Sequence, residues 1–209
     1  DGRDPKKIYL NPDFQFDRLD LNKLMLKFDN FGQDEIVSNN LTGRISGKLT
    51  GKILMHTDMV PIIDQSLIKL DFQVLNGLII GYAPFLALED FFKDKNLHRI
   101  AFDTLQNSVT VDKGMMTIPS MTINTSLGFL ILEGSQDMDL NMNYLVRVPF
   151  KMVTQAASQK LFNRKKDDMD PDKEDDIIAH DPKRKTTFVN VRITGTPDVY
   201  KVSIERRKK

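Results

Sequence analysis

Long runs of the sequence alternate apolar and polar residues with a period of two. From Leu41 to Met55 every odd position is apolar or glycine, and the even positions of 42–52 are polar. Successive side chains of a β-strand point to opposite faces, so this pattern predicts a strand with one apolar and one polar face. The same alternation recurs over 66–77 and over 138–150. A sheet of such strands has to cover its apolar face with a second layer, with helices or with a ligand.

Three glycines, Gly43, Gly47 and Gly51, stand on the apolar side of the first of these strands. Glycine weakens a strand and often marks curvature or a close approach of the backbone. One interpretation is a curved sheet in which the glycines relieve crowding. The other is a concave face that is kept open for a ligand.

Other segments complete the expected order of elements. Over 19–28 the alternation slips by one residue, which predicts a bulge or two successive strands. The segment 83–94 has a proline suited to a first helical turn and apolar residues on one face, so it predicts a short helix. A second short helix is expected over 152–162, where apolar residues recur four apart.

The remaining β pattern runs from 101 to 150 with short turn sequences, and the chain ends in a hairpin around the turn sequence GTPD. The sequence therefore predicts a mainly β fold, a curved antiparallel sheet (groove or open barrel-like) with two short helices. We expect residues 1–209 to form a single β-rich domain that is a fragment of a larger protein. The segment 164–186, an acidic run between basic clusters, is expected to be a disordered charged loop within it.

Composition excludes several classes of function. The 30 basic and 29 acidic residues give a net charge of +1, and the few aromatic residues are not interleaved with basic runs, so we expect no nucleic-acid partner. The absence of cysteine removes disulfides, zinc–thiolate sites and thiol catalysis. The most apolar stretch, 74–92, is too polar to cross a bilayer, so any membrane association is expected to come from a segment outside this chain.

No motif or residue cluster predicts catalysis, a metal site or a cofactor. Asp168, Asp170 and Asp172 have the spacing of a calcium loop, but Lys173 stands where that loop needs glycine. The three histidines share no ligand-like spacing, and the sequence has no nucleophile elbow, zincin, P-loop or dinucleotide motif. We therefore expect a protein that is not an enzyme, with no metal and no cofactor.

Two blocks, 101–162 and 187–204, resemble the C-terminal region of AsmA-like proteins of Gram-negative bacteria. The likeness rests on a V-x-V-x-x-G strand leading into M-x-I-P-x-M-x-I-N, on S-L-G before a strand ending in E-G, on Q-D-M-D-L-N-M-N-Y-L-V-R-V-P, and on an I-T-G-T-P-D hairpin. The resemblance implies a periplasmic location, an inner-membrane anchor outside this fragment and a role in outer-membrane biogenesis. It also implies kinship with bridge-like lipid-transfer proteins, whose long curved sheets form an apolar groove.

Two short helices leave part of the apolar face uncovered, and together with the resemblance this leads us to expect an apolar β-groove that binds or transfers phospholipid or another lipid. The methionines of the second half suit an adaptable apolar surface, although ordinary core filling is the more common role of such residues. The alternative is a self-packed structural β domain that acts as a protein-interaction scaffold among envelope proteins. The expected lipid-binding residues lie on the alternating strands: Ile45, Leu49, Ile53, Ile68, Leu70, Phe72, Met138, Leu140, Met142 and Tyr144.

Overall fold

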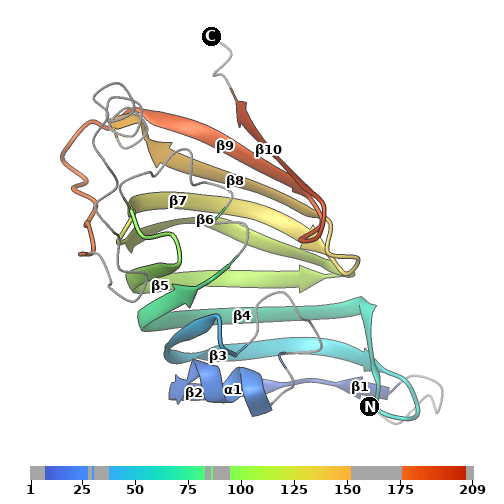
Figure 1. The fold of residues 1–209 in the computed structure, drawn as a ribbon. Helices are drawn as coiled ribbons and strands as arrows, with labels where there is room; N and C mark the ends of the chain where they lie inside the picture. The colour runs from blue at the N-terminus through green and yellow to red at the C-terminus, as the bar shows by residue number, and fades with distance from the viewer. Residues whose placement is uncertain are drawn as a thin grey trace.

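The computed structural model describes residues 8–27, 30, 38–82, 86, 95–151 and 176–205. In them the chain forms one ten-stranded antiparallel sheet in the order β1-β3-β4-β5-β6-β7-β8-β9-β10, with β2 also paired to β3 (Figure 1). The predicted mainly β, antiparallel fold is therefore confirmed. The strands are β1 (Ile8–Leu10), β2 (Asp13–Asp20), β3 (Leu41–Met55), β4 (Pro61–Ile80), β5 (Arg99–Asp112), β6 (Met115–Thr125), β7 (Gly128–Asp137), β8 (Met142–Pro149), β9 (Phe188–Gly195) and β10 (Tyr200–Glu205).

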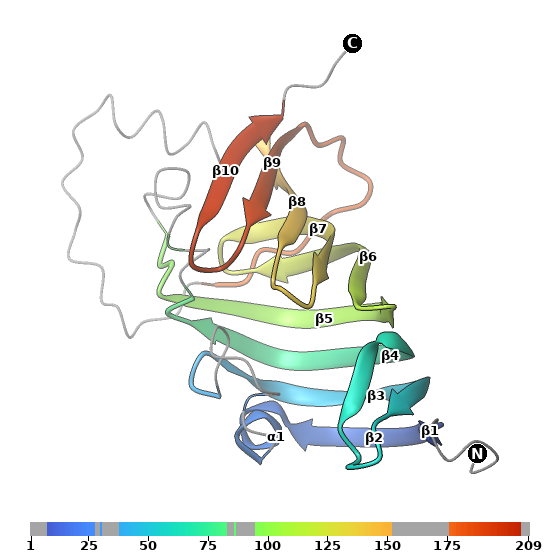
Figure 2. The same ribbon diagram turned by 90° about the vertical axis from the view of Figure 1, so that its right-hand side faces the viewer.

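From β3 to β10 each strand pairs with the strand that follows it in the chain. Short turns join β3 to β4, β5 to β6, β7 to β8 and β9 to β10, and they all lie at one end of the sheet, which faces the viewer in Figure 2. The turn between β6 and β7 lies at the other end. This is the meander that the short turn sequences predict, because an antiparallel pair needs only a few linking residues.

The predicted division into an apolar and a polar face is present where β3, β4 and β5 are in register. On one face Leu49, Leu70 and Val109 are cross-strand neighbours in β3, β4 and β5. One residue further along, Thr50 faces Lys69, and Lys69 faces Thr110. In this part of β3–β5 the alternation seen in the sequence becomes an apolar face and a polar face, because the three strands are in register there. Register shifts interrupt the alternation elsewhere, as between Lys52 and Leu54 of β3 and between Ile118 and Met121 of β6.

The sheet curves toward its apolar face. In Figure 2 β3–β5 run across the view while β9 and β10 stand nearly upright, as the twist of successive strands requires. One core cluster joins Ile100 of β5 to Val146 of β8 and Val191 of β9, although β5 is not a neighbour of β8 or β9 in the sheet. We call it the upper core; its buried members are Leu97, Ile100, Leu127, Leu130, Met142, Val146, Val148, Val191 and Ile193.

A second core cluster lies under the helix α1 (Leu21–Lys27). Leu21 and Met25 are buried there, so this short helix covers the adjacent part of the apolar face. We call it the lower core; its buried members are Leu21, Met25, Ile45, Val74, Phe102 and Ile123.

The helix α1 corrects the expectation for 19–28. The chain does bulge in β2, between Phe16 and Leu19, but a helix follows it and not a second strand. Leu21, Leu24 and Met25 have the i, i+3, i+4 spacing of a helical face, and burying that face against the sheet outweighs the local alternation. The predicted helix over 83–94 lies outside the described residues apart from Leu86, and the one over 152–162 lies outside them entirely.

The charged segment 164–186 is described from residue 176 onward. There the backbone N–H of Ile178 donates to the Thr125 carbonyl oxygen at 3.0 Å, and the N–H of His180 donates to the Asn124 side-chain oxygen at 2.9 Å. The His180 ring also lies 4.3 Å from the ring of Phe129, centroid to centroid. The end of this segment is thus held against β6 and β7, and the expectation of disorder for 164–175 concerns residues outside the described ranges.

Glycines of the sheet sit opposite aromatic residues of the neighbouring strand. Gly47 faces both Phe16 and Phe72, Gly77 faces Phe102, and Gly134 faces Tyr144. A Cβ atom on Gly77 would lie 1.9 Å from the Phe102 ring, and one on Gly134 would lie 2.5 Å from the Tyr144 ring. At these two positions a ring covers the place where a side chain would be, which restores packing that glycine alone loses.

The glycines of β3 are also sites of close packing. A Cβ atom would lie 2.7 Å from Val74 at Gly43, 2.3 Å from the Asp71 carbonyl oxygen at Gly47 and 2.6 Å from the Leu67 carbonyl oxygen at Gly51. Of the two interpretations of these glycines, the structure therefore favours relief of crowding within a curved sheet.

Candidate functional site

Part of the apolar face belongs to neither core cluster. It lies on β3–β6, in the half of these strands toward the end where the short turns are. All of its side chains are partly exposed to solvent. We call this surface the open apolar face; it consists of Leu49, Ile53, Ile68, Leu70, Val109, Val111, Met116 and Ile118.

Strand pairing positions these side chains in rows. Ile68 lies opposite Val111, which lies opposite Met116, and the next row holds Leu49, Leu70 and Val109. With strands about 4.8 Å apart, four strands span about 14 Å. The rows form a continuous apolar surface on the concave side of the sheet, wide enough for more than one hydrocarbon chain.

Four of the predicted lipid-binding residues belong to the open apolar face: Leu49, Ile53, Ile68 and Leu70. Ile45 and Phe72 instead pack in or against the lower core beneath α1. Ile45 is buried there, whereas Phe72 is partly exposed and continues the face of Leu70, two residues along β4.

The four predicted residues of 138–144 do not line this surface. Met142 is a buried member of the upper core, and Tyr144 packs against it. Met138 and Leu140 precede β8 and form the turn between β7 and β8, where Leu140 has a positive φ of 62°. The predicted strand over 138–150 begins at Met142, because the turn occupies the first four positions.

Sequence reasoning missed half of the open apolar face: Val109, Val111, Met116 and Ile118. The signal was present, because Val109 and Val111 alternate with Ser108 and Thr110, and Met116 and Ile118 alternate with Thr117. Only the pairing of β5 with β4 and β6 places them beside Leu70 and Ile68.

The polar face carries ion pairs between neighbouring strands and along them. Lys48 Nζ lies 2.8 Å from a carboxylate oxygen of Asp13, and Lys69 Nζ lies 3.0 Å from one of Asp71. Hydrogen bonds from Ser108 and Lys69 lower the pKa of Asp71. This carboxylate is therefore held ionised, which is the reverse of what a general acid at neutral pH needs.

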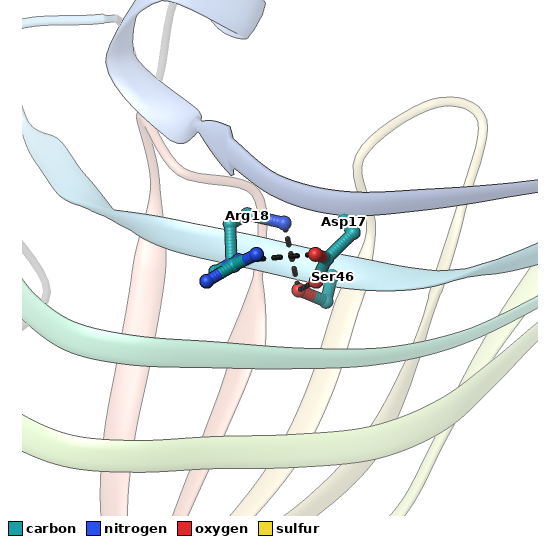
Figure 3. Close-up of polar contacts among 3 residues, drawn as sticks. All are labelled: Asp17, Arg18 and Ser46. Carbon is teal, nitrogen blue, oxygen red and sulfur yellow. Dashed lines mark hydrogen bonds and ion pairs between the residues drawn. The ribbon is translucent and has the colours of Figure 1, made fainter.

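At the edge of the polar face a small network holds the bulge of β2 (Figure 3). Arg18 has a positive φ of 47°, and its backbone N–H donates to the Ser46 hydroxyl oxygen at 2.8 Å. The Ser46 hydroxyl donates to Asp17 at 2.9 Å, and Arg18 Nε donates to the same carboxylate at 3.0 Å. The Ser46 and Arg18 bonds lower the pKa of Asp17. The network fixes the bulge that bends this edge strand, and such bulges hinder pairing with other chains.

A second polar cluster lies on β7–β10. Arg192 donates to both carboxylate oxygens of Glu205 and, at 2.6 Å, to the Asn143 side-chain oxygen, while Arg147 lies 3.1 Å from Glu133. The hydrogen bond from Arg192 lowers the pKa of Glu205 and raises that of Arg192. A depression of about 590 Å³ lies beside this cluster and is lined by residues such as Thr187 and Asn190. Its charged lining residues, Arg147 and Glu205, already have ion-pair partners in the cluster.

The pKa of Tyr144, which faces Gly134 in the sheet, makes the stability of the protein depend on pH. Its hydroxyl donates to Gln136, and burial raises its pKa from 10.0 to about 12. Since the folded pKa lies above the unfolded value, this tyrosine contributes stability that is complete below pH 10 and is lost as the pH rises toward 12. We expect the free energy of unfolding to fall less between about pH 9.5 and 11.5 in Tyr144→Phe than in the wild type, measured by urea denaturation. Equal falls in the two proteins would contradict this assignment.

Within the described part of the chain, no group of three or more His, Asp or Glu residues could hold a metal ion. The same residues include no helix that is both long and apolar enough to cross a membrane. Comparisons with protein-family models, with curated proteins and with solved structures found no match to this chain.

Proposed function

We propose that the open apolar face is a shallow groove that binds the hydrocarbon chains of phospholipid or another lipid, without catalysis. In this proposal the chain is a periplasmic domain of an AsmA-like protein that is anchored in the inner membrane by a segment outside this chain and serves outer-membrane biogenesis. One observation carries the lipid proposal. Eight neighbouring apolar side chains on the concave side of the sheet are partly exposed and belong to neither core cluster.

The chemistry of this surface suits an acyl chain. Burying a methylene group contributes about 0.8 kcal/mol, so a chain that buries several of them binds without a specific polar contact. The surface is made of aliphatic side chains and methionine, which adapt to chains of different shape. The paired charges of the polar face point the other way, so they do not oppose an apolar ligand.

The test uses neighbouring residues of β5 that face opposite sides. Val109→Asp places a carboxylate on the open apolar face, and Thr110→Asp places the same carboxylate on the polar face. Both changes put aspartate near the end of the same strand, so they share the cost in β-propensity. Each purified protein is incubated with vesicles of phosphatidylethanolamine, separated from them and examined by native mass spectrometry.

We expect the wild type and Thr110→Asp to carry phospholipid, and Val109→Asp to carry about tenfold less or none. We expect both variants to stay folded, with unfolding free energies within about 1 kcal/mol of each other. If Val109→Asp instead loses several kcal/mol more than Thr110→Asp, the face is a closed core and the chain is a self-packed scaffold. A wild type that takes up no phospholipid would also overturn the proposal.

A further inference from the structure

The turns that join β3–β4, β5–β6, β7–β8 and β9–β10 form an arc at one end of the sheet (Figure 2). They comprise residues 56–60, 113–114, 138–141 and 196–199. Each of them carries, or directly precedes, a large apolar side chain that is exposed. We call these residues the tip residues; they are Met59, Val60, Met115, Met138 and Val199.

The exposure of the tip residues is high. Val199 is 77% exposed, Met59 58%, Val60 52%, Met138 47% and Met115 44%. A single exposed apolar side chain needs no explanation, but apolar groups at every turn of one end form a repeated arrangement.

The turn at the opposite end of the sheet behaves differently. Leu127, between β6 and β7, is 0% exposed and belongs to the upper core. The turn is held by the Thr125 hydroxyl, which donates to the Gly128 carbonyl oxygen at 2.6 Å, and by the N–H of Ser126, which donates to the Ala101 carbonyl oxygen at 2.9 Å. A short turn of this sheet can therefore bury its apolar residue, so exposure at the other end does not follow from turn geometry.

Acidic residues accompany the tip residues. Asp58, Asp139 and Asp198 are exposed and each is next to a tip residue in the sequence, while Asp112 ends β5 before Met115. Among the described residues no ion pair joins any of these four carboxylates to a cation. The four turns contain one lysine, Lys113, and no arginine. These four turns therefore combine exposed apolar groups with more acidic than basic residues.

We propose that this end of the sheet is a docking surface for a protein partner that presents an apolar patch bordered by lysine or arginine. The apolar tip residues supply the contact, and the carboxylates beside them select a basic partner and speed its approach. A membrane is the less suitable occupant, because surfaces that bind membranes usually carry lysine and arginine beside their apolar groups and biological membranes are often anionic. The proposal does not depend on lipid binding at the open apolar face.

The probe is a fluorescein-labelled peptide of alternating leucine and lysine, with a leucine–glutamate peptide as its counterpart. Binding is measured by fluorescence anisotropy at a physiological ionic strength of about 0.15 M. The first variant, Met59→Ser/Met138→Ser/Val199→Ser, removes apolar contact, and the second, Asp58→Asn/Asp139→Asn/Asp198→Asn, removes charge. The control is Leu26→Ser, which changes a side chain that is 68% exposed on α1, away from the turns.

We expect the lysine peptide to bind the wild type saturably and the glutamate peptide to bind at least about tenfold more weakly. Each triple variant is expected to weaken the lysine peptide about tenfold or more, while Leu26→Ser and Val109→Asp change its affinity less than about twofold. Because Val109 belongs to the open apolar face, this variant separates the two surfaces.

Three outcomes would overturn the proposal. The first is no binding of the lysine peptide, or equal binding by the first triple variant. The second is a loss of binding in Val109→Asp without a loss in the triple variants, which would assign the peptide to the open apolar face. The third is binding of the wild type to phosphatidylcholine vesicles that the first triple variant loses, which would make the tip end a membrane surface.

Discussion

Replacing Leu127 with alanine is expected to lower the free energy of unfolding by about 2–5 kcal/mol. Leu127 is 0% exposed and packs in the upper core, although it lies in a turn, where substitutions are usually tolerated. The backbone and hydroxyl hydrogen bonds that hold this turn prevent it from collapsing into the space that the leucine leaves. Urea denaturation followed by circular dichroism measures the change.

The matched control is Val199→Ala, in the turn between β9 and β10. Its side chain is 77% exposed, so we expect a change of no more than about 0.5 kcal/mol. Similar losses in the two variants would show that Leu127 does not organise the core in the way that its burial indicates.

The second large effect is expected from the pair Gly77 and Phe102, which face each other in β4 and β5. Phe102 is 1% exposed, and Phe102→Ala is expected to cost about 3–5 kcal/mol. Gly77→Ala is also expected to be strongly destabilising, because its Cβ atom would lie 1.9 Å from the Phe102 ring. The backbone at Gly77 lacks a positive φ, so an alanine would conflict with the ring and not with the backbone.

A double-mutant cycle isolates this conflict. Once Phe102→Ala has removed the ring, Gly77→Ala is expected to cost little, which gives a coupling of about 1–3 kcal/mol between the two sites. Gly81→Ala serves as the control, because Gly81 has a positive φ of 61° and a Cβ atom there would meet no other atom within 4 Å. Its cost comes from backbone strain, so Phe102→Ala should leave it unchanged. If the losses of unfolding free energy in Gly77→Ala and Phe102→Ala simply added in the double variant, the contact between the two residues would be contradicted.

The expected lining residues show how far sequence reasoning extends to the candidate site. Leu49, Ile53, Ile68 and Leu70 lie on the open apolar face, and the alternation of their strands was sufficient to place them on one side. Met142 has the same alternation and lies in the upper core, 4% exposed. The difference comes from contacts with residues of other strands, which bury Met142 and leave the open apolar face exposed. A sequence period of two carries no information about such contacts.

The helix α1 shows the converse case. Its residues fit an alternating pattern and a helical pattern about equally, because Leu21, Leu24 and Met25 also have the spacing of a helical face. At that place α1 covers the apolar side chains that β3–β6 contribute to the lower core, and it adds two buried side chains of its own. Local propensity alone gives no basis for this choice, since tertiary packing routinely overrides it.

The sequence alone predicts most of the strands from β3 onward, their apolar and polar faces and the meander. These follow from local geometry, because successive residues of a strand alternate in direction and short turns join antiparallel neighbours. Tertiary packing sets which part of the apolar face is covered and which turns keep their apolar residues in solvent. Curvature brings β8 and β9 over the start of β5 and leaves the other half of β3–β6 open. Burial of that kind depends on contacts between residues far apart in the chain, which no local pattern specifies.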